Sequence, residues 1–245
     1  MPAAIVSFIA AGSLCAQDLN FPGVTPFVIL NASLNKKVDL NVLSLSKIRV
    51  GEHIIDGVKY DPGPLQIYTH AIFSYKITGH WQAGAGFAFQ RNNPFRDDWK
   101  NDYRLLQQVV YILQGSKWKL SSRLRVEERW FRFPDASGSF GTRLKQQNAF
   151  TRQLNGEKFY WQAVNELYAI PSGARNSFVS ENWFYTGLGV ALRSFGRWDN
   201  GFGWNTMTRN TKHDLTNLFF LQTMLTITFH RHEKEVEPEM ESGHF

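Results

Sequence analysis

The stretch "WKLSSRLRVEERWFR", residues 118–132, decides the fold class, because its two alternating sets of side chains differ sharply. The even positions are mostly apolar, with an aromatic residue near each end: Trp118, Leu120, Ser122, Leu124, Val126, Glu128 and Trp130. The odd positions are mostly polar or charged: Lys119, Ser121, Arg123, Arg125, Glu127, Arg129 and Phe131. Period-two alternation predicts a β-strand, whose successive side chains point to opposite faces of a sheet.

The same alternation recurs in about eleven segments of the chain. Short turns rich in Gly, Asn and Lys join some neighbouring segments, and longer polar loops join the others: residues 51–63, 91–101, 134–141 and 171–177. Short periplasmic turns and longer extracellular loops are typical of an outer-membrane β-barrel. A soluble sandwich or a lipocalin-like barrel also alternates, but its loops need not sort in this way.

The length of the segments separates a membrane barrel from a soluble one. A transmembrane strand needs about 9–11 residues, whereas strands of globular proteins cluster near five or six, and most segments here exceed that length. We therefore predict an all-β protein, an antiparallel transmembrane β-barrel, with apolar strand faces towards lipid and ionic faces towards the lumen. Gln146 and Asn148 depart from this pattern, because they fall on the predicted lipid face of their strand.

The predicted number of strands depends on two weak stretches of sequence. Bacterial single-chain barrels have an even number of strands, and we expect both barrel termini on the periplasmic side. A short strand over residues 18–21, ended by a turn at Pro22-Gly23, raises the eleven segments to the predicted twelve. Loss of the weak segment over residues 198–210 gives the alternative of ten strands.

The two ends of the chain differ in composition from the middle. Residues 1–16 have the apolar run and small residues of a cleaved secretory signal peptide. Residues 17–230 form the predicted barrel, and the Glu-rich residues 231–245 form a tail that we expect to be disordered. The segment "LTITF", which ends at Phe229, resembles the C-terminal signal of barrel-assembly substrates. We expect export to the outer membrane of a Gram-negative bacterium, with outer-membrane lipid and the assembly machinery as partners.

Composition narrows the classes of ligand. The net charge is +6, and the Glu-rich tail is acidic, so the rest of the chain is strongly basic. A basic body is suited to nucleic acid, anionic lipid or an anionic solute, but no helix-turn-helix, zinc or RNA-binding signature supports nucleic acid. The single cysteine, Cys15, excludes an intramolecular disulfide and a multi-cysteine zinc site. No metal or cofactor site is predicted.

Charged residues on the predicted lumenal faces form the candidate site. The ten residues of this cluster are Arg49, Arg104, Arg123, Arg125, Glu127, Arg129, Arg143, Lys145, Glu166 and Glu181. Lys47 is also predicted to face the lumen. One interpretation is a narrow, anion-favouring channel or solute-binding barrel, with a small anionic solute such as a phosphate or carboxylate as its ligand. The alternative is a structural or interaction barrel, in which arginine and glutamate side chains satisfy one another and plug the lumen. The sequence leaves both open.

A hydrolytic enzyme is a distant third hypothesis, because some outer-membrane barrels hydrolyse lipids. His70 and Ser74 lie on one face of one strand, about two pleats apart. A base and a hydroxyl at that separation do not form a nucleophile pair without a third orienting group. We therefore assign no catalytic residue and predict that the protein is not an enzyme.

Several motifs carry a resemblance to a known family. They are "AGAGFAF", "YRLLQQ" with Arg104 and Gln108, "SSRLRVEERWF", "NELY" with Glu166, and "ENWFYTGLGV", in that order along the chain. Together they resemble a family of uncharacterised outer-membrane β-barrels, a domain of unknown function common in Bacteroidota-type Gram-negative bacteria. The resemblance covers roughly residues 26–229 and implies a fold and a location, but no activity. The chain departs from the pattern at Trp183, where an arginine is expected, and in its Glu-rich tail.

Overall fold

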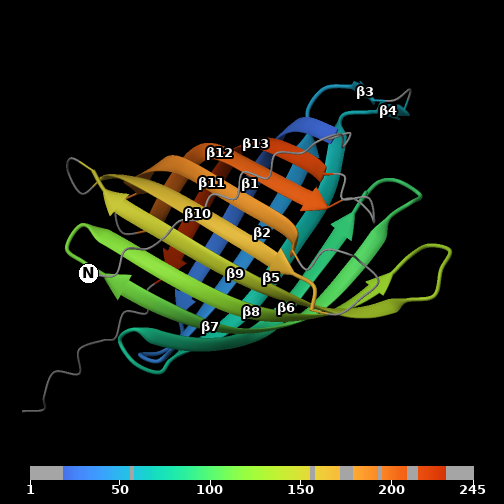
Figure 1. Cartoon of the computed structure of the whole chain (residues 1–245). Coiled ribbons are helices and arrows are strands. Elements are labelled where there is room, and N and C mark those ends of the chain that lie inside the picture. The colour runs from blue at the N-terminus through green and yellow to red at the C-terminus, as the bar shows by residue number, and fades with distance from the viewer. Residues whose placement is uncertain are drawn as a thin grey trace, which may run out of the picture.

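The computed structural model is a closed β-barrel (Figure 1), and it describes residues 19–55, 58–154, 158–171, 179–192, 195–208 and 215–229. Within these residues eleven strands form the ring. They are β1 (Leu19–Ser33), β2 (Val38–Arg49), β5 (Gly63–Lys76), β6 (Trp81–Asn92), β7 (Lys100–Gln114), β8 (Trp118–Arg132), β9 (Ser139–Gln153), β10 (Phe159–Ala169), β11 (Val179–Leu192), β12 (Gly196–Thr208) and β13 (Leu215–Phe229). A separate hairpin, β3 (His53–Ile55) and β4 (Val58–Tyr60), projects beyond one end of the barrel (Figure 1).

The ring closes through one parallel pair. All other neighbouring strands are antiparallel, whereas β1 and β13 run in the same direction, with Phe27 opposite Met224. This geometry follows from the odd number of strands, because a ring of alternating directions with an odd count must contain one parallel pair.

The predictions of twelve strands and of ten are therefore both wrong. Pro22 and Gly23 do not end a short strand but lie inside β1, where Gly23 pairs with Arg49. A proline has no N–H, but it keeps its carbonyl, and the Pro22 carbonyl accepts a hydrogen bond of 3.1 Å from the Val50 amide. The weak segment that the ten-strand alternative discards is β12, which is paired along its length with β11 and β13.

The ends of the described chain lie at opposite ends of the barrel, contrary to the expectation that both barrel termini share one side. β1 begins at the end that carries the longer loops, since Gly23 pairs with Arg49 just before the β3–β4 hairpin. β13 ends at the other end, where Phe229 pairs with Ala32 beside the short turn between β1 and β2. The predicted signal peptide and the predicted acidic tail lie outside the described residues.

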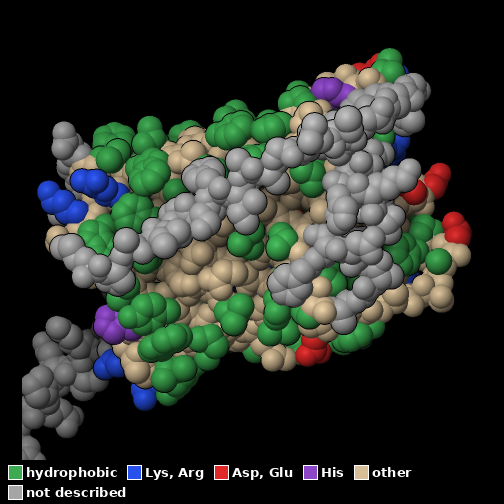
Figure 2. Space-filling view, viewed as in Figure 1, with side chains coloured by type: hydrophobic (Ala, Val, Ile, Leu, Met, Phe, Trp, Pro, Cys, Tyr) green, Lys and Arg blue, Asp and Glu red, His purple; other side chains and the backbone are tan. Residues whose placement is uncertain are grey.

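The alternation of β8 sorts its side chains as the sequence predicts. Arg125 and Glu127 point inwards and are each 1% exposed, whereas Leu124, on the opposite face of the strand, points outwards and is 53% exposed. Large apolar side chains are exposed on the outward faces of other strands as well: Phe73, Phe87, Leu188 and Leu221. Figure 2 shows hydrophobic side chains spread over the flank of the barrel, with charged side chains mostly towards its two ends. The apolar face is therefore outside and the ionic face inside.

The inner surface is not charged all the way round. One sector is an apolar cluster made of residues from β1, β2, β5, β6, β7 and β13: Phe27, Leu45, Tyr68, Ile72, Ala88, Leu106 and Met224. The charged side chains of the lumen come mainly from β7, β8 and β9. The lumen thus has an apolar side and an ionic side.

The two sequence exceptions on the outer face are real features of the sheet. Gln146 and Asn148 both point outwards, as their positions in β9 require. The Gln146 amide donates to the Ser122 hydroxyl at 2.8 Å and to the Asn148 side chain at 3.3 Å. Nearby, Asn165 donates to Asn182 at 2.8 Å. These outward amides therefore satisfy part of their hydrogen-bonding capacity along the sheet.

The described residues contain no helix long and apolar enough to cross a membrane.

Candidate functional site

A cavity of about 1180 Å³ occupies the barrel interior. The structure places all ten residues of the predicted lumenal cluster, and Lys47, on its lining: Lys47, Arg49, Arg104, Arg123, Arg125, Glu127, Arg129, Arg143, Lys145, Glu166 and Glu181. They converge because each strand of the barrel turns one set of alternate side chains towards the axis. The residues are not equivalent, however, because some are locked in ion pairs and others are not.

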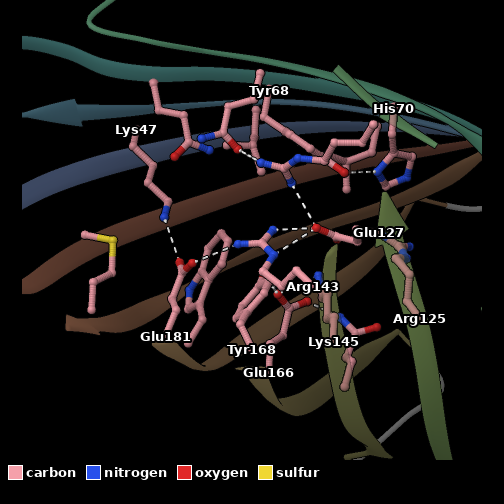
Figure 3. Close-up of a pocket in the computed structure, with 18 of the residues that line it drawn as sticks. Lys47, Tyr68, His70, Arg125, Glu127, Arg143, Lys145, Glu166, Tyr168 and Glu181 are labelled. Carbon is pink, nitrogen blue, oxygen red and sulfur yellow. Dashed lines mark hydrogen bonds and ion pairs between the residues drawn. The ribbon is translucent and has the colours of Figure 1, made fainter. Parts of the chain in front are cut away.

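An ion-pair belt crosses the lumen (Figure 3). We define it as Arg104, Glu127, Arg143, Glu181 and Lys47, which come from β7, β8, β9, β11 and β2 respectively. Figure 3 labels the last four of these residues. The successive nitrogen–oxygen distances along the belt are 3.4, 2.6, 3.3 and 3.7 Å. β2 and β11 are not neighbours in the ring, so the last link spans open lumen rather than one sheet face. The belt therefore braces one side of the barrel against another.

Asp102 extends the belt beyond Arg104. Its carboxylate accepts from the Arg104 guanidinium at 2.7 Å and also pairs with Arg129, and its side chain is fully buried. The sequence predicted the two arginines but not this carboxylate. The missed indication was parity, because Asp102 lies two residues before Arg104 and thus on the same strand face.

A fourth carboxylate, Glu166, pairs with another cation on the short-turn side of the belt. Its side chain pairs with Lys145 at 2.7 Å and accepts from the Tyr168 hydroxyl at 2.5 Å. The Arg143 guanidinium lies over the Tyr168 ring, 4.3 Å from its centroid. A tyrosine in this place serves both the ion pair and the belt, since its hydroxyl donates while its ring faces a cation.

Trp183 stands in the lumen where the family resemblance led us to expect an arginine. The Lys47 ammonium lies 4.7 Å from the centroid of the Trp183 ring. The same ammonium donates to the Asn205 side chain at 2.8 Å, and Asn205 in turn donates to Glu181 at 2.9 Å. The ring therefore supplies an aromatic face to a cation that is already present.

Arg123 and Arg125 differ from the other lumenal cations. None of the ion pairs among the described residues includes either of them. Arg125 donates to the neutral side-chain oxygen of Gln108, from Nε at 3.1 Å and from Nη2 at 2.8 Å. The Nε of Arg123 is buried and has no hydrogen-bond partner in the described structure. In Figure 3 Arg125 stands apart from the dashed ion pairs of the belt.

Arg49 belongs to the mouth of the barrel rather than to the belt. Its Nε donates to the Asp61 carbonyl at 2.8 Å. Its guanidinium carbon lies 5.4 and 5.5 Å from the ring centroids of Phe21 and Tyr60. These contacts attach the segment that carries the β3–β4 hairpin to the end of β2. Arg49 therefore holds a loop at the end of the barrel.

The β3–β4 hairpin carries its own surface ion pairs. Lys59 donates to Glu52 at 2.8 Å and lies 3.4 Å from Asp61. The hydrogen bond from the ammonium to Glu52, together with the one to Asp61, raises the pKa of Lys59 above its ordinary value. All three side chains are about half exposed, so these pairs contribute little to stability.

The charge balance of the cavity lining is strongly positive. Eleven lysines and arginines line it against three glutamates, Glu127, Glu166 and Glu181. Three of these cations were absent from the sequence prediction: Lys100, Lys119 and Arg197. The fully buried Asp102 and Asp199 lie behind the lining and offset only two of the excess charges. The lumen is therefore cationic even after its internal ion pairs are formed.

His70 makes no contact of the kind a hydrolase would need with Ser74. Its Nδ1 lies 3.0 Å from the Tyr68 hydroxyl, and its Nε2 lies 2.8 Å from Oδ1 of Asn41. Both ring nitrogens are thus engaged with other partners. Across the described part of the chain, no three His, Cys, Asp or Glu side chains gather as a metal site would require.

Two comparisons with known proteins bear on this barrel. The model of a family described as a protein of unknown function (DUF2490) matches residues 30–215, which include most of the barrel. No curated protein matches the sequence.

Proposed function

The chain belongs to the DUF2490 family of proteins of unknown function, and from that premise we propose that it is an outer-membrane β-barrel whose cationic lumen binds small anions and favours their passage over that of cations. The observation that carries this proposal is the excess of eleven lysines and arginines over three glutamates on the cavity lining. A lumen of one sign with low-dielectric walls concentrates ions of the opposite sign.

The outer surface supports a membrane location. A soluble barrel is not expected to expose many large apolar side chains on its exterior, because contact between apolar surface and water is unfavourable. In this barrel Phe87 and Leu221 are 71% and 66% exposed. Strands range from 11 residues in β10 to 15 in β8, long enough to cross a bilayer at a tilt. The inside-polar, outside-apolar order is that of outer-membrane barrels.

Two groups of exposed aromatic residues support the same location. Near the short turns lie Trp81, Trp118, Trp161 and Trp198, and near the longer loops lie Tyr103, Trp130, Phe140 and Trp204. Aromatic side chains at both ends of an apolar band match the girdles of transmembrane barrels, because their amphipathic rings favour the two interfaces. The proposal thus places the short turns in the periplasm and the longer loops outside the cell.

Assembly of such a barrel needs a recognition signal at its last strand. β13 ends in "LTITF", and Phe229 is 56% exposed at the end of the strand. We include the barrel-assembly machinery as a partner during biogenesis and outer-membrane lipid as the partner of the folded exterior. Export through a cleaved signal peptide is part of the same proposal.

The ion-pair belt favours a second candidate function, a structural or interaction barrel with a plugged lumen. Arg143 and Lys47 reach Glu181 from opposite sides, so carboxylates and cations meet inside the lumen rather than along its wall. In this candidate the belt blocks the passage of solutes through the lumen. In this candidate the loops at one end, including the β3–β4 hairpin, meet the partner.

Planar-bilayer recordings separate the two candidates. The refolded protein is inserted between unequal KCl solutions, and the reversal potential gives the ratio of anion to cation permeability. We expect an anion-selective conductance that falls towards no selectivity in the double variant Arg123→Gln, Arg125→Gln. Arg152→Gln is the matched control, because Arg152 lies on the outward face of β9, and its selectivity should equal that of the native protein.

Two results contradict the channel proposal: the absence of any conductance from folded, inserted protein, which favours the plugged barrel, or a preference for cations. An open anion-selective pore contradicts the plugged barrel instead. The membrane location itself fails if the protein without residues 1–16 folds as a monomer in the absence of detergent or lipid.

A further inference from the structure

Two unlike walls of the cavity face each other across the lumen. In the ring, β8 is separated from β1 by β7, β6, β5 and β2, and from β13 by β9, β10, β11 and β12. β8 therefore lies opposite the β1–β13 pair. The β8 wall carries Arg123 and Arg125, and the opposite wall carries Phe27 and Met224, all of which line the cavity.

These walls lie at the same height along the barrel axis, next to the belt on the side of the short turns. β2 and β8 both run towards the end with the longer loops, and Lys47 and Glu127 are their members in the belt. The next inward positions towards the short turns are Leu45 on β2 and Arg125 on β8. Leu45 pairs with Phe27, which extends the apolar level to β1.

The apolar wall is continuous from β2 to β13. Phe27 pairs with Leu45 on one side and with Met224 on the other, and Ile29 and Leu43 pack against this cluster. All five side chains line the cavity, and Phe27, Leu45 and Met224 are 8%, 6% and 8% exposed. Covering the apolar surface that these side chains turn to the cavity with an alkyl group is favourable in proportion to the area covered.

On the opposite wall, Arg123 and Arg125 have no ion-pair partner among the described residues, because the Glu127 carboxylate of the same strand pairs with Arg104 and Arg143 instead. Arg125 is 1% exposed, and its hydrogen-bond acceptor is the neutral Gln108 rather than a carboxylate. Arg123 stands two residues away on the same face, with its Nε buried and without a hydrogen-bond partner in the described structure. Buried charges are normally paired, and planar guanidinium groups match the two oxygens of a carboxylate or phosphate. An oxyanion is the group that completes this wall.

We propose that the cavity binds an amphiphile with a single alkyl chain and an oxyanion head, a carboxylate or a phosphate. The head pairs with Arg123 and Arg125, and the chain covers Phe27, Leu45 and Met224. A cavity of about 1180 Å³ is somewhat larger than the roughly 300–1,000 Å³ usual for small-molecule sites, so it has room for a head group and a chain. This inference rests on the proposed cationic lumen and names the ligand class within it.

Calorimetry on the full-length protein in nanodiscs of zwitterionic lipid tests the inference, with empty nanodiscs as the blank. The probes are dodecanoate and dodecyl phosphate, their chainless counterparts acetate and inorganic phosphate, and the uncharged dodecanol. We expect one or both of the charged dodecyl compounds to bind at least about tenfold more tightly than acetate, phosphate and dodecanol, and the better of the two identifies the head group.

Variants test which residues contact the head group of the ligand and which contact its alkyl chain. Arg125→Gln and Arg123→Gln should each weaken binding of the charged amphiphile about tenfold or more, since a hydrogen bond to a charged group is lost. Leu43→Asn should weaken the amphiphile but leave inorganic phosphate unchanged. Arg152→Gln, on the outward face of β9, should leave every probe unchanged. Heat-modifiable migration in gels verifies that each variant is folded, and Arg123→Gln serves if Arg125→Gln does not fold.

The outcomes distinguish this inference from the proposed function. If acetate and dodecanoate bind equally and both need the arginines, the proposal of an amphiphilic ligand is wrong and the proposal of an anion-binding lumen is supported. If dodecanol binds as tightly as dodecanoate, the cavity selects apolar chains alone and the inference is overturned. If no anion depends on Arg123 or Arg125, the inference and the anion-binding lumen both fail.

Discussion

Glu127 is the residue on which the interior of the barrel most depends. Its side chain is almost fully buried, and it accepts from Arg143 at 2.6 Å and from Arg104 at 3.4 Å. One carboxylate thus serves two cations from two other strands. Removal of one partner from a buried ion pair leaves an uncompensated charge, which costs more than the pair itself contributes.

We predict that Glu127→Gln lowers the free energy of unfolding by about 3–5 kcal/mol. The neutral amide keeps the size of the side chain but leaves Arg104 and Arg143 without the charge that they share. Urea titration in detergent micelles, followed by tryptophan fluorescence, measures the change as a shift of the midpoint at constant slope.

Glu128→Gln is the matched control for this prediction. Glu128 is the next residue of β8 and points to the other face, where its one side-chain hydrogen bond among the described residues is a 3.5 Å contact with Gln107. We expect a change within about 0.5 kcal/mol. Equal losses for the two variants would show that Glu127 is not the centre of the belt.

Sequence alone predicted the membership of the site better than its pairings. The alternation of β8 was sufficient to bring Arg125 and Glu127 to the lumen, because parity follows from the geometry of one strand. The contact between Lys47 and Glu181 was beyond sequence reasoning, since it joins strands that are not neighbours and depends on the closure and width of the whole ring. For the same reason nothing in the sequence distinguished Arg125, which has no carboxylate partner, from Arg143, which has two.

At the scale of the element, β8 shows why alternation is informative and β1 shows where it misleads. In β8 the two faces differ at almost every position, so a register error would expose every charge. In β1 the Pro22-Gly23 pair has the composition of a turn, but the strand continues through it, because the Pro22 carbonyl still accepts from Val50. Turn residues indicate where a chain can bend, and pairing decides whether it does.

Nitroxide labels along β8 test the assignment of its faces. We predict that labels at Leu124 and Val126 collide more often with oxygen, which dissolves in lipid, than with a water-soluble nickel chelate, in protein reconstituted into vesicles. Labels at Ser121 and Arg123 should lack this preference for oxygen, because they point into the polar lumen. Similar collision ratios on both faces would contradict the lipid-facing exterior.

At the scale of the whole molecule, the strand count was the part of the fold that sequence could not provide. Eleven alternating segments were evident, but the rule of even counts led to a twelfth barrel strand that is not found among the described residues. An odd ring has to close through a parallel pair, and nothing in the local sequence of β1 or β13 states their relative direction. The number of strands depends on how the whole ring closes, and the sequence of a single segment does not determine it.

Engineered cysteines test the parallel closure. Val28 and Leu225 are directly paired on β1 and β13, and neighbouring strands hold Cα atoms within the range that a disulfide requires. We predict that Val28→Cys with Leu225→Cys forms a disulfide under mild oxidation, in a background without Cys15. The pair Val28→Cys with Leu221→Cys is the control, because Leu221 is opposite Val24 instead, and it should cross-link poorly. Equal yields from the two pairs would exclude the observed register.

The parallel pairing of β1 with β13 also affects the order in which the barrel is expected to fold. Every other neighbouring pair in the ring joins strands that are consecutive or separated only by the β3–β4 hairpin, whereas this pair joins the two ends of the described chain. Contacts so distant in sequence form late, and parallel pairing with a strand that contains Pro22 and Pro26 offers fewer and weaker hydrogen bonds than its neighbours. We therefore expect the barrel to fold as an open sheet with two unprotected edges, which are exposed to aggregation until β13 pairs with β1.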